Sequence, residues 1–420
     1  MGATDRTASR GRASAAANSS DVRHRDHGGT AVLDGLRGVA ILLVLCYHTW
    51  LFSWLTPQWS LAGRAVPIDV LPRTGYLGVD LFFLISGFVL FFPYAVRSVR
   101  DGPPHGIGQY AYRRFIKIVP SYVVVLAATV AVALPLLGGF GSLAVTLAQH
   151  AVFVHSFYAD ALGPVNSVFW SLAIEVQFYV IFPALAWAFR RRPALVYAAL
   201  IAIALAYRVG AARCCLLDER ITRELPAFLD VFASGMLAAY LVARLARNAA
   251  AGKRYTPHFT ALAIVCAGAA FALLTSANAV QYVPGGRERW DVYNRTAFAA
   301  ALGAGAFASC FAQRWWRALL TNAVFRFFSL ISYNLYLWHT LVMIWMWKHG
   351  VPRAATANPH DDDHWKIVYI ALGWSISIAL ATAVTYFIER PLLGTVKLQS
   401  FAFDWHLMRA PRGEPSRTRT

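Results

Sequence analysis

The chain alternates between long apolar runs and short polar segments. A helix needs about 20 apolar residues to cross the hydrocarbon core of a membrane. Lipid offers the backbone no hydrogen-bond partners, so each membrane-crossing run must be helical. Ten runs approach this length, at residues 36–55, 76–96, 117–138, 170–189, 194–212, 226–243, 258–277, 296–313, 326–347 and 367–388. The pattern predicts an all-α fold, a polytopic membrane helix bundle of about ten transmembrane helices.

Polar segments flank this apolar region. Residues 1–31 lack the apolar core of a signal peptide, and we expect them to form a disordered cytoplasmic tail. Residues 396–420 are predicted to be a second disordered, basic cytoplasmic tail, which leaves 32–395 as the transmembrane domain. The apolar stretch 142–157 is predicted to be a short or re-entrant helix that does not cross, because a crossing would invert the distribution of basic loops after it.

The basic residues predict the orientation. With both termini inside, 27 of the 39 Lys and Arg residues fall in the inner loops and tails. Inner loops of membrane proteins carry such an excess, so an N-in, C-in arrangement is predicted. The inner excess sits in short clusters between apolar runs, which argues against nucleic-acid binding despite a net charge of +18.

Composition supports the membrane assignment and narrows the chemistry. Charged residues make up 14% of the chain, against about a quarter in soluble domains. The five cysteines contain no CxxC pair, so neither a disulfide framework nor a metal site is predicted. The acidic run at 361–363 reads as solvent-exposed charge.

Ionisable residues inside apolar spans are costly and are therefore candidates for function. In the first span Arg37 and His48 are eleven residues apart, which places them on one helix face about 16 Å apart along the axis. Arg37 stands at the inner boundary and His48 lies deep toward the outer half. The structural alternatives are a membrane-surface anchor for Arg37 and a hydrogen-bonded core histidine for His48.

The next two spans add an acid and a basic cluster. Asp80 shares its span with Ser86 and is predicted to be a structural residue that meets a cation from another helix. Arg113, Arg114 and Lys117 stand at the inner surface, where they either follow the positive-inside rule or form a phosphate-binding cradle.

Two further spans carry polar residues at helical spacing. Glu175 lies inside an apolar run between Ser171 and Tyr179 and is predicted to be functional. Tyr336 and His339 share a face of a later span, where a packed, hydrogen-bonded histidine is the alternative to a functional one. Glu389 and Arg390 are interpreted as a local ion pair at a helix end, and no role is predicted for Asp230.

Six segments in order resemble the signatures of the acyltransferase-3 family. They cover about residues 32–395 and read DGLRGVAILLVLCYH, GVDLFFLISGF, RRFIKIVP, FWSLAIEVQFY, SYNLYLWH and ERP. The resemblance implies a ten-helix membrane domain that transfers acyl groups, usually acetyl from acetyl-CoA, to hydroxyls. Family acceptors include glycans, glycolipids and secreted small molecules, and family distribution implies a bacterial inner (plasma) membrane. No metal and no nucleic acid are implied.

The resemblance also assigns residues. Arg37 and His48 match the Arg-x10-His element, Glu175 matches a Ser-Leu-x-x-Glu element, and Arg114 matches the first position of an Arg-x-x-Arg signature. Lys117 stands where a second Arg is usual, so it offers a point charge rather than a planar fork.

These assignments predict that donor binding and catalysis are carried out by different residues. CoA phosphates bind the inner cations Arg37, Arg114 and Lys117, and the thioester reaches His48 along the face that Arg37 lines. His48 acts as the general base, oriented by Glu175. Substrate or oxyanion contacts are expected from the candidates Ser86, Tyr336 and His339.

Three alternatives stay open at the level of sequence. In the first, the acyl group passes through a covalent intermediate on the protein before it reaches the acceptor. A proton-coupled transporter or exporter would use the buried Asp80, Glu175 and His339. A non-catalytic scaffold would keep the fold without the chemistry. The sequence does not identify the acceptor.

Overall fold

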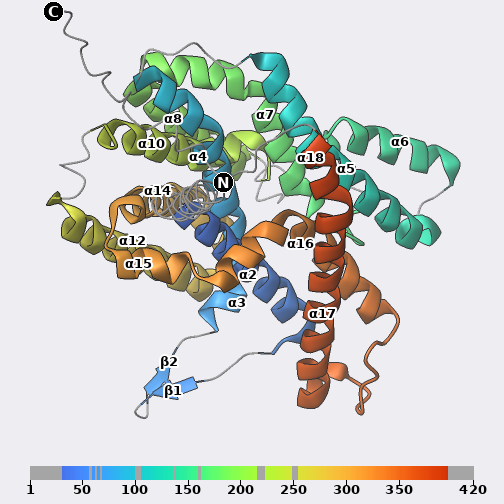
Figure 1. Ribbon diagram of the computed structural model, residues 1–420. Helices are drawn as coiled ribbons and strands as arrows, with labels where there is room; N and C mark the ends of the chain where they lie inside the picture. The colour runs from blue at the N-terminus through green and yellow to red at the C-terminus, as the bar shows by residue number, and fades with distance from the viewer. Residues whose placement is uncertain are drawn as a thin grey trace, which may run out of the picture.

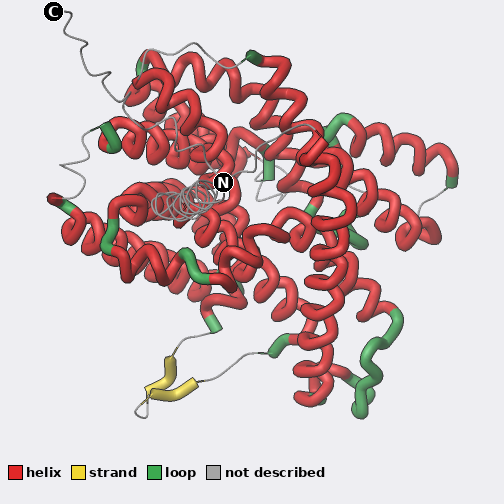
Figure 2. The backbone as a smooth tube through the Cα atoms, in the orientation of Figure 1, coloured by secondary structure: helices red, strands yellow, loops and turns green. Residues whose placement is uncertain are grey.

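The computed structural model describes residues 31–55, 59–61, 64–66, 69–99, 106–136, 139–158, 162–214, 223–247 and 254–395. Within these ranges nearly all of the chain is helical and packs into one bundle (Figure 1, Figure 2). The predicted tails, at 1–31 and 396–420, lie outside the described residues except for Ala31, which begins the first described helix.

Each of the ten predicted spans falls on a helix. Among the described residues, nine helical segments are long and apolar enough to cross a membrane, which confirms the polytopic helical bundle. The tenth span is α14 (Arg295–Phe311), whose 17 residues extend about 26 Å. The nine segments contain α2 (Ala31–Ser53), α4 (Gly78–Val99), α5 (Ile107–Ala133), α7 (Phe169–Arg191), α8 (Pro193–Cys214), α10 (Leu229–Leu245), α12 (Thr256–Val280), α16 (Ala323–Lys348) and α17 (Asp363–Val384).

Short elements connect these helices. The antiparallel hairpin of β1 (Trp59–Leu61) and β2 (Arg64–Val66), which the sequence pattern did not predict, stands away from the bundle (Figure 2). The apolar stretch at 142–157 contains α6 (Phe140–Ala151), whose twelve residues extend about 18 Å and are too short to cross. The other short elements are α3 (Val70–Thr74), η1 (Gly75–Leu77), η2 (Leu134–Leu136), η3 (His155–Phe157), η4 (Leu225–Phe228), α13 (Gly286–Tyr293), α15 (Arg314–Leu320), η5 (Pro359–Asp361), the π-helix η6 (Thr385–Glu389) and α18 (Arg390–Thr395).

The centre of the bundle is the contact between α4 and α10. A Cβ atom at Gly87 would overlap the backbone carbonyl of Phe232, and one at Gly235 would overlap the carbonyl of Leu84. Between membrane helices there is little hydrophobic driving force, so stability depends on such close backbone approach and tight packing. The two glycines therefore set the distance between the two most buried helices.

A second glycine contact joins α2 to α16. A Cβ at Gly38 would overlap the carbonyl of Phe325, so no larger side chain fits at this crossing. Helix α2 carries Arg37 and His48, and α16 carries Tyr336. The packing thus brings the helix of Arg37 and His48 against the helix of Tyr336 (Figure 1).

Buried ion pairs join several helices. Arg208 of α8 lies 2.7 Å from Asp230 of α10, and both bond Thr296 of α14. Asp80 of α4 has a cation partner in Arg295 of α14, with 3.0 Å between Oδ1 and Nε. Charges in a low-dielectric interior need such partners, so these pairs constrain how the helices assemble.

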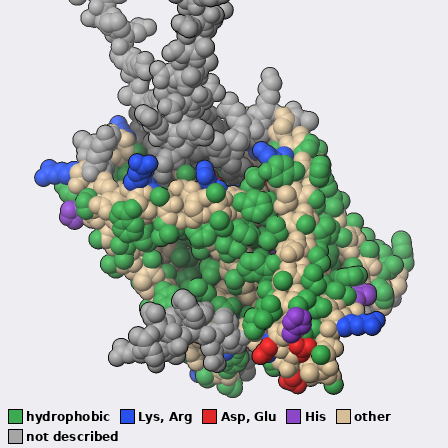
Figure 3. Space-filling view, turned by 60° about the horizontal axis from the view of Figure 1, so that its bottom comes forward, with side chains coloured by type: hydrophobic (Ala, Val, Ile, Leu, Met, Phe, Trp, Pro, Cys, Tyr) green, Lys and Arg blue, Asp and Glu red, His purple; other side chains and the backbone are tan. Residues whose placement is uncertain are grey.

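Charge is unevenly distributed on the face shown in Figure 3. Lys and Arg side chains are spread along one edge, acidic side chains gather at the opposite edge with basic side chains beside them, and a broad apolar surface lies between the two edges. The acidic run 361–363, predicted only to be solvated, also begins α17. Asp362 accepts hydrogen bonds from the backbone N–H groups of Trp365 and Ala355, which lower the pKa of its carboxyl.

The glycine contact predicts a large difference between two identical substitutions. Gly235→Val forces α10 away from α4 and should destabilise the protein by about 1–3 kcal/mol or more. The matched control is Gly268→Val, because a Cβ at Gly268 of α12 meets nothing within 4 Å. The measurements are thermal unfolding and the monodisperse fraction after purification in detergent. Equal stability of the two variants would contradict the close approach.

Candidate active site

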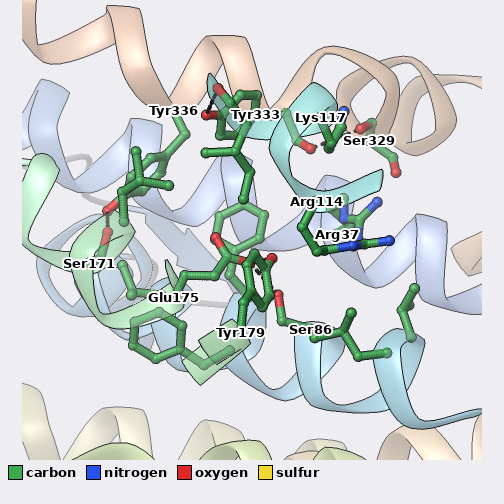
Figure 4. Close-up of a pocket in the computed structure, with 18 residues that line it drawn as sticks. Arg37, Ser86, Arg114, Lys117, Ser171, Glu175, Tyr179, Ser329, Tyr333 and Tyr336 are labelled. Carbon is green, nitrogen blue, oxygen red and sulfur yellow. Dashed lines mark hydrogen bonds between the residues drawn. The ribbon is translucent and has the colours of Figure 1, made fainter. Parts of the chain in front are cut away.

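A cavity of about 110 Å³ opens among α2, α4, α5, α7 and α16 (Figure 4). We call it the Arg37 cavity. Arg37 and Arg114 lie at one end of it in the figure and Ser171 at the other. Its polar lining consists of Arg37, Ser86, Arg114, Lys117, Ser171, Glu175, Tyr179, Ser329, Ser332, Tyr333 and Tyr336.

Glu175 is the acceptor at the centre of this cavity. Ser86 of α4 donates to its Oε1 at 2.5 Å, and the Tyr179 hydroxyl, one turn along α7, donates to the same oxygen. The Arg114 guanidinium lies 5.8 Å from the centre of the Tyr179 ring. The carboxylate is thus held by two hydroxyls within the Arg37 cavity.

Lys117 forms an ion pair that the sequence did not predict. Its ammonium binds Glu389, which also accepts from Asn334 Nδ2 at 2.7 Å. The interpretation of Glu389 and Arg390 as a local ion pair is therefore wrong for the buried acid. The π-helix η6 contains Glu389, and its wider turn re-aims the residues after it relative to a regular α-helix.

A second cavity, of about 200 Å³, lies farther along α2 toward the acidic end. We call it the His48 cavity. It combines aromatic rings with both signs of charge. The aromatic, polar and charged lining residues include Tyr47, His48, Tyr76, Asp80, Trp170, Arg223, Arg287, Glu288, Asp291, Arg295 and Tyr336.

A second imidazole contacts the ring of His48. His339 Nε2 lies 3.1 Å from His48 Nδ1, and the two rings meet edge to face with centroids 4.8 Å apart. His339 is fully buried, whereas His48 lines the cavity. Glu175, the predicted orienting partner of His48, is bonded instead to Ser86 and Tyr179, and the side chain beside the His48 ring is that of His339.

The continuous path predicted between Arg37 and His48 is divided in two. The residues follow each other along α2, but each lines its own cavity, and Val79 and Tyr336 line both. The Tyr336 hydroxyl lies 2.5 Å from that of Ser171. At this point the wall between the cavities is one side chain thick.

The hydroxyl and imidazole hydrogens near the wall already have acceptors. Ser86 donates to Glu175, and Ser171 donates to the carbonyl of Val168, which leaves Tyr336 as the donor to Ser171. His339 Nδ1 faces the carbonyl of its own helix turn at 2.9 Å. Oxyanion contacts by the predicted candidates Ser86, Tyr336 and His339 therefore require these bonds to rearrange.

Arg223 is a candidate that the sequence reasoning missed. It lines the His48 cavity, and its guanidinium lies 5.3 Å from the centre of the Trp170 ring. A guanidinium has five N–H donors, so it can contact a developing oxyanion while keeping other partners. In the sequence it stands in a polar outer segment, where a single charge carries no functional signal.

The residues and geometry define a multi-pass membrane protein with two polar cavities stacked along one helix. The family model described as an acyltransferase domain matches residues 31–390. The chain therefore belongs to the acyltransferase-3 family.

Curated relatives share parts of this domain. The chain is 27% identical over 164 residues to the peptidoglycan O-acetyltransferase OatA of Listeria monocytogenes, which is 36% of this chain and 23% of that protein. It is 30% identical over 168 residues to a putative O-acetyltransferase of Staphylococcus aureus (strain COL), covering 36% of this chain and 24% of the relative. The matched segments thus span about a quarter of these relatives' length. No solved structure matches the chain significantly.

The buried pair of Lys117 and Glu389 predicts an asymmetric response to mutation. Glu389→Gln leaves a largely buried ammonium without its counter-charge and should cost about 3 kcal/mol of stability. Adding Lys117→Met removes that charge and should restore part of the loss in thermal unfolding. As a control, Asp363→Asn removes the exposed partner of Lys366 and should change little. Additive effects at Lys117 and Glu389 would argue against the pair.

Proposed function

We propose that this protein is an integral membrane O-acyltransferase that transfers an acyl group, most simply acetyl, from acyl-CoA to a hydroxyl of a carbohydrate-containing or lipid-linked acceptor. The observation that carries the proposal is the shared wall: in a chain of this family, a cavity lined by cations and a cavity lined by an imidazole meet at Tyr336. We place the protein in a bacterial plasma membrane, with the donor supplied from the cytosol.

The Arg37 cavity suits the donor. Arg37 and Arg114 offer planar guanidinium groups for phosphates at its basic end. A volume of about 110 Å³ holds the acyl and thioester end of the donor, not the nucleotide. The nucleotide would remain at the mouth, where Tyr94, Tyr110 and Arg113 line an adjoining depression of about 70 Å³.

The His48 cavity suits a polyhydroxylated acceptor. Aromatic rings of Tyr47, Tyr76 and Trp170 offer flat apolar surfaces, and the neighbouring carboxylates and guanidinium groups offer hydrogen-bond partners for hydroxyls. A purely apolar acceptor would leave these charged groups unsatisfied. The name of the Listeria relative, a peptidoglycan O-acetyltransferase, supports an acceptor that contains sugar.

The reaction proceeds by general base catalysis at the shared wall. His48 takes the proton of the acceptor hydroxyl, and the oxygen attacks the thioester carbonyl carbon. The C–S bond breaks, the new C–O ester bond remains, and the proton from His48 goes to the leaving sulfur to give CoA thiol. Arg223, which lines the same cavity as His48, stabilises the negative oxygen of the tetrahedral intermediate in this proposal.

Substitution of His48 tests the activity. His48→Ala should lower acyl transfer by about 10²- to 10⁴-fold, because the general base is lost, while acyl-CoA binding stays unchanged. The assay follows radiolabelled acetyl-CoA in lipid nanodiscs with glycan and glycolipid fractions as acceptors. His349→Ala, an exposed histidine near the end of α16, is the control. Absence of acetyl-CoA consumption by the wild type with every acceptor fraction would favour a transporter.

Substitution of the cations tests the donor site. Arg37→Gln and Arg114→Gln should each raise the KM for acetyl-CoA about tenfold or more, because a hydrogen bond to a charged phosphate is lost. The effect should shrink when 3′-dephospho-CoA thioester is the donor if that phosphate is the one contacted. The control is Arg244→Gln, an exposed arginine of α10. Unchanged KM values in both cavity variants would remove this donor site.

A further inference from the structure

The hydrogen positions of the two contacting histidines follow from their acceptors. A carbonyl oxygen can only accept, so His339 Nδ1, 2.9 Å from the carbonyl of Leu335, carries a hydrogen. In neutral His339 the Nε2 atom then has no hydrogen and accepts hydrogen bonds through its lone pair. His48 Nδ1, 3.0 Å from the carbonyl of Val44, carries a hydrogen for the same reason. It shares that hydrogen with His339 Nε2 at 3.1 Å.

This assignment leaves one ring nitrogen for chemistry. Both nitrogens of His339 and Nδ1 of His48 are committed, so the free lone pair is on His48 Nε2, in the ring that lines the His48 cavity. We propose that His339 is a positioning residue, the neutral hydrogen-bond acceptor that holds His48 with Nε2 available as the base. This inference rests on the acyltransferase activity proposed above.

The geometry also gives His339 a role when His48 is protonated and therefore charged. When His48 Nε2 takes the acceptor's proton, Nδ1 keeps its hydrogen, and the bond to His339 Nε2 becomes charge-assisted and stronger. The proton then leaves from Nε2 to the sulfur of the leaving CoA, so His339 itself neither gains nor loses a proton. A neutral acceptor does this without a permanent charge beside the apolar core of α2 and α16.

His339 is itself held rigidly and outside the cavities. It is fully buried and lines neither the Arg37 cavity nor the His48 cavity. The next residue, Thr340, donates to Asn166 at 2.6 Å, and Asn166 in turn bonds the carbonyl of Leu337 on the same helix. Helix α16 is thus fixed on both sides of His339.

Substitution of His339 by Gln or by Asn tests its two hydrogen bonds one at a time, because each amide side chain can replace only one of them. In His339→Gln the side-chain oxygen falls near the position of Nε2 and can accept from His48, whereas His339→Asn keeps a donor near Nδ1 for Leu335 but does not reach His48. We expect the Gln variant to retain kcat within a few-fold. The Asn and His339→Leu variants should lose about 10- to 100-fold in kcat, the loss expected for a hydrogen bond to a charged ring. The KM for acetyl-CoA should stay constant in all three.

A second measurement needs no turnover. Diethyl pyrocarbonate modifies neutral imidazole at an available lone pair, and mass spectrometry of the purified protein reports which histidine reacts. We expect His48 to be modified in the wild type and in His339→Gln, and more slowly in His339→Asn. Monodispersity and acetyl-CoA binding show that each variant is folded.

The outcomes separate the two proposals. If wild-type protein transfers no acyl group, the proposed function fails, and the modification rates still test the histidine pair. If the Gln and Asn variants have equal kcat, or His48 is modified equally fast in both, the positioning role of His339 is overturned.

Discussion

The structure depends on the close packing of α2 against α16. Glycine at position 38 lets the backbones approach until the Phe325 carbonyl occupies the space where a Cβ would be. By itself, helix α2 provides a cation, Arg37, near one end and an imidazole, His48, eleven residues farther along. Only the approach of α16 adds Tyr336 at the wall and His339 behind the imidazole. Membrane helices gain most from such tight contact, since lipid is as apolar as the side chains it would replace.

Several buried charges of the described bundle are paired with a charge of opposite sign on another helix. Three ion pairs each join two helices: Arg208 with Asp230, Arg295 with Asp80, and Lys117 with Glu389. The second and third of these pairs join helices that are distant in sequence. Each pair avoids an isolated charge in a low-dielectric interior and therefore favours one arrangement of helices over others. The Asp80 and Lys117 pairs border the two cavities, so the groups that fix the helices also shape the cavity walls.

Two cavities that share a thin wall at Val79 and Tyr336 fit a transfer between two compartments. An open channel would let water and ions cross the membrane, whereas a wall one side chain thick at Tyr336 keeps the two ends apart. In the proposed reaction a thioester carbonyl and a hydroxyl need only come within reach of each other. In that proposal the cationic end recognises the donor and the imidazole end carries the chemistry, in a chain that belongs to the acyltransferase-3 family.

The sequence by itself determined the ten helical spans and the order of Arg37 and His48 along one helix, because hydrophobic length and the 3.6-residue period are local properties. It also indicated that Asp80 needs a cation. The tertiary structure decided which residues are partners: His339, 291 positions away, contacts His48, and Lys117 pairs with Glu389 across 272 positions. Such contacts depend on how helices pack, and helical periodicity carries no information about the neighbour that a polar face will meet.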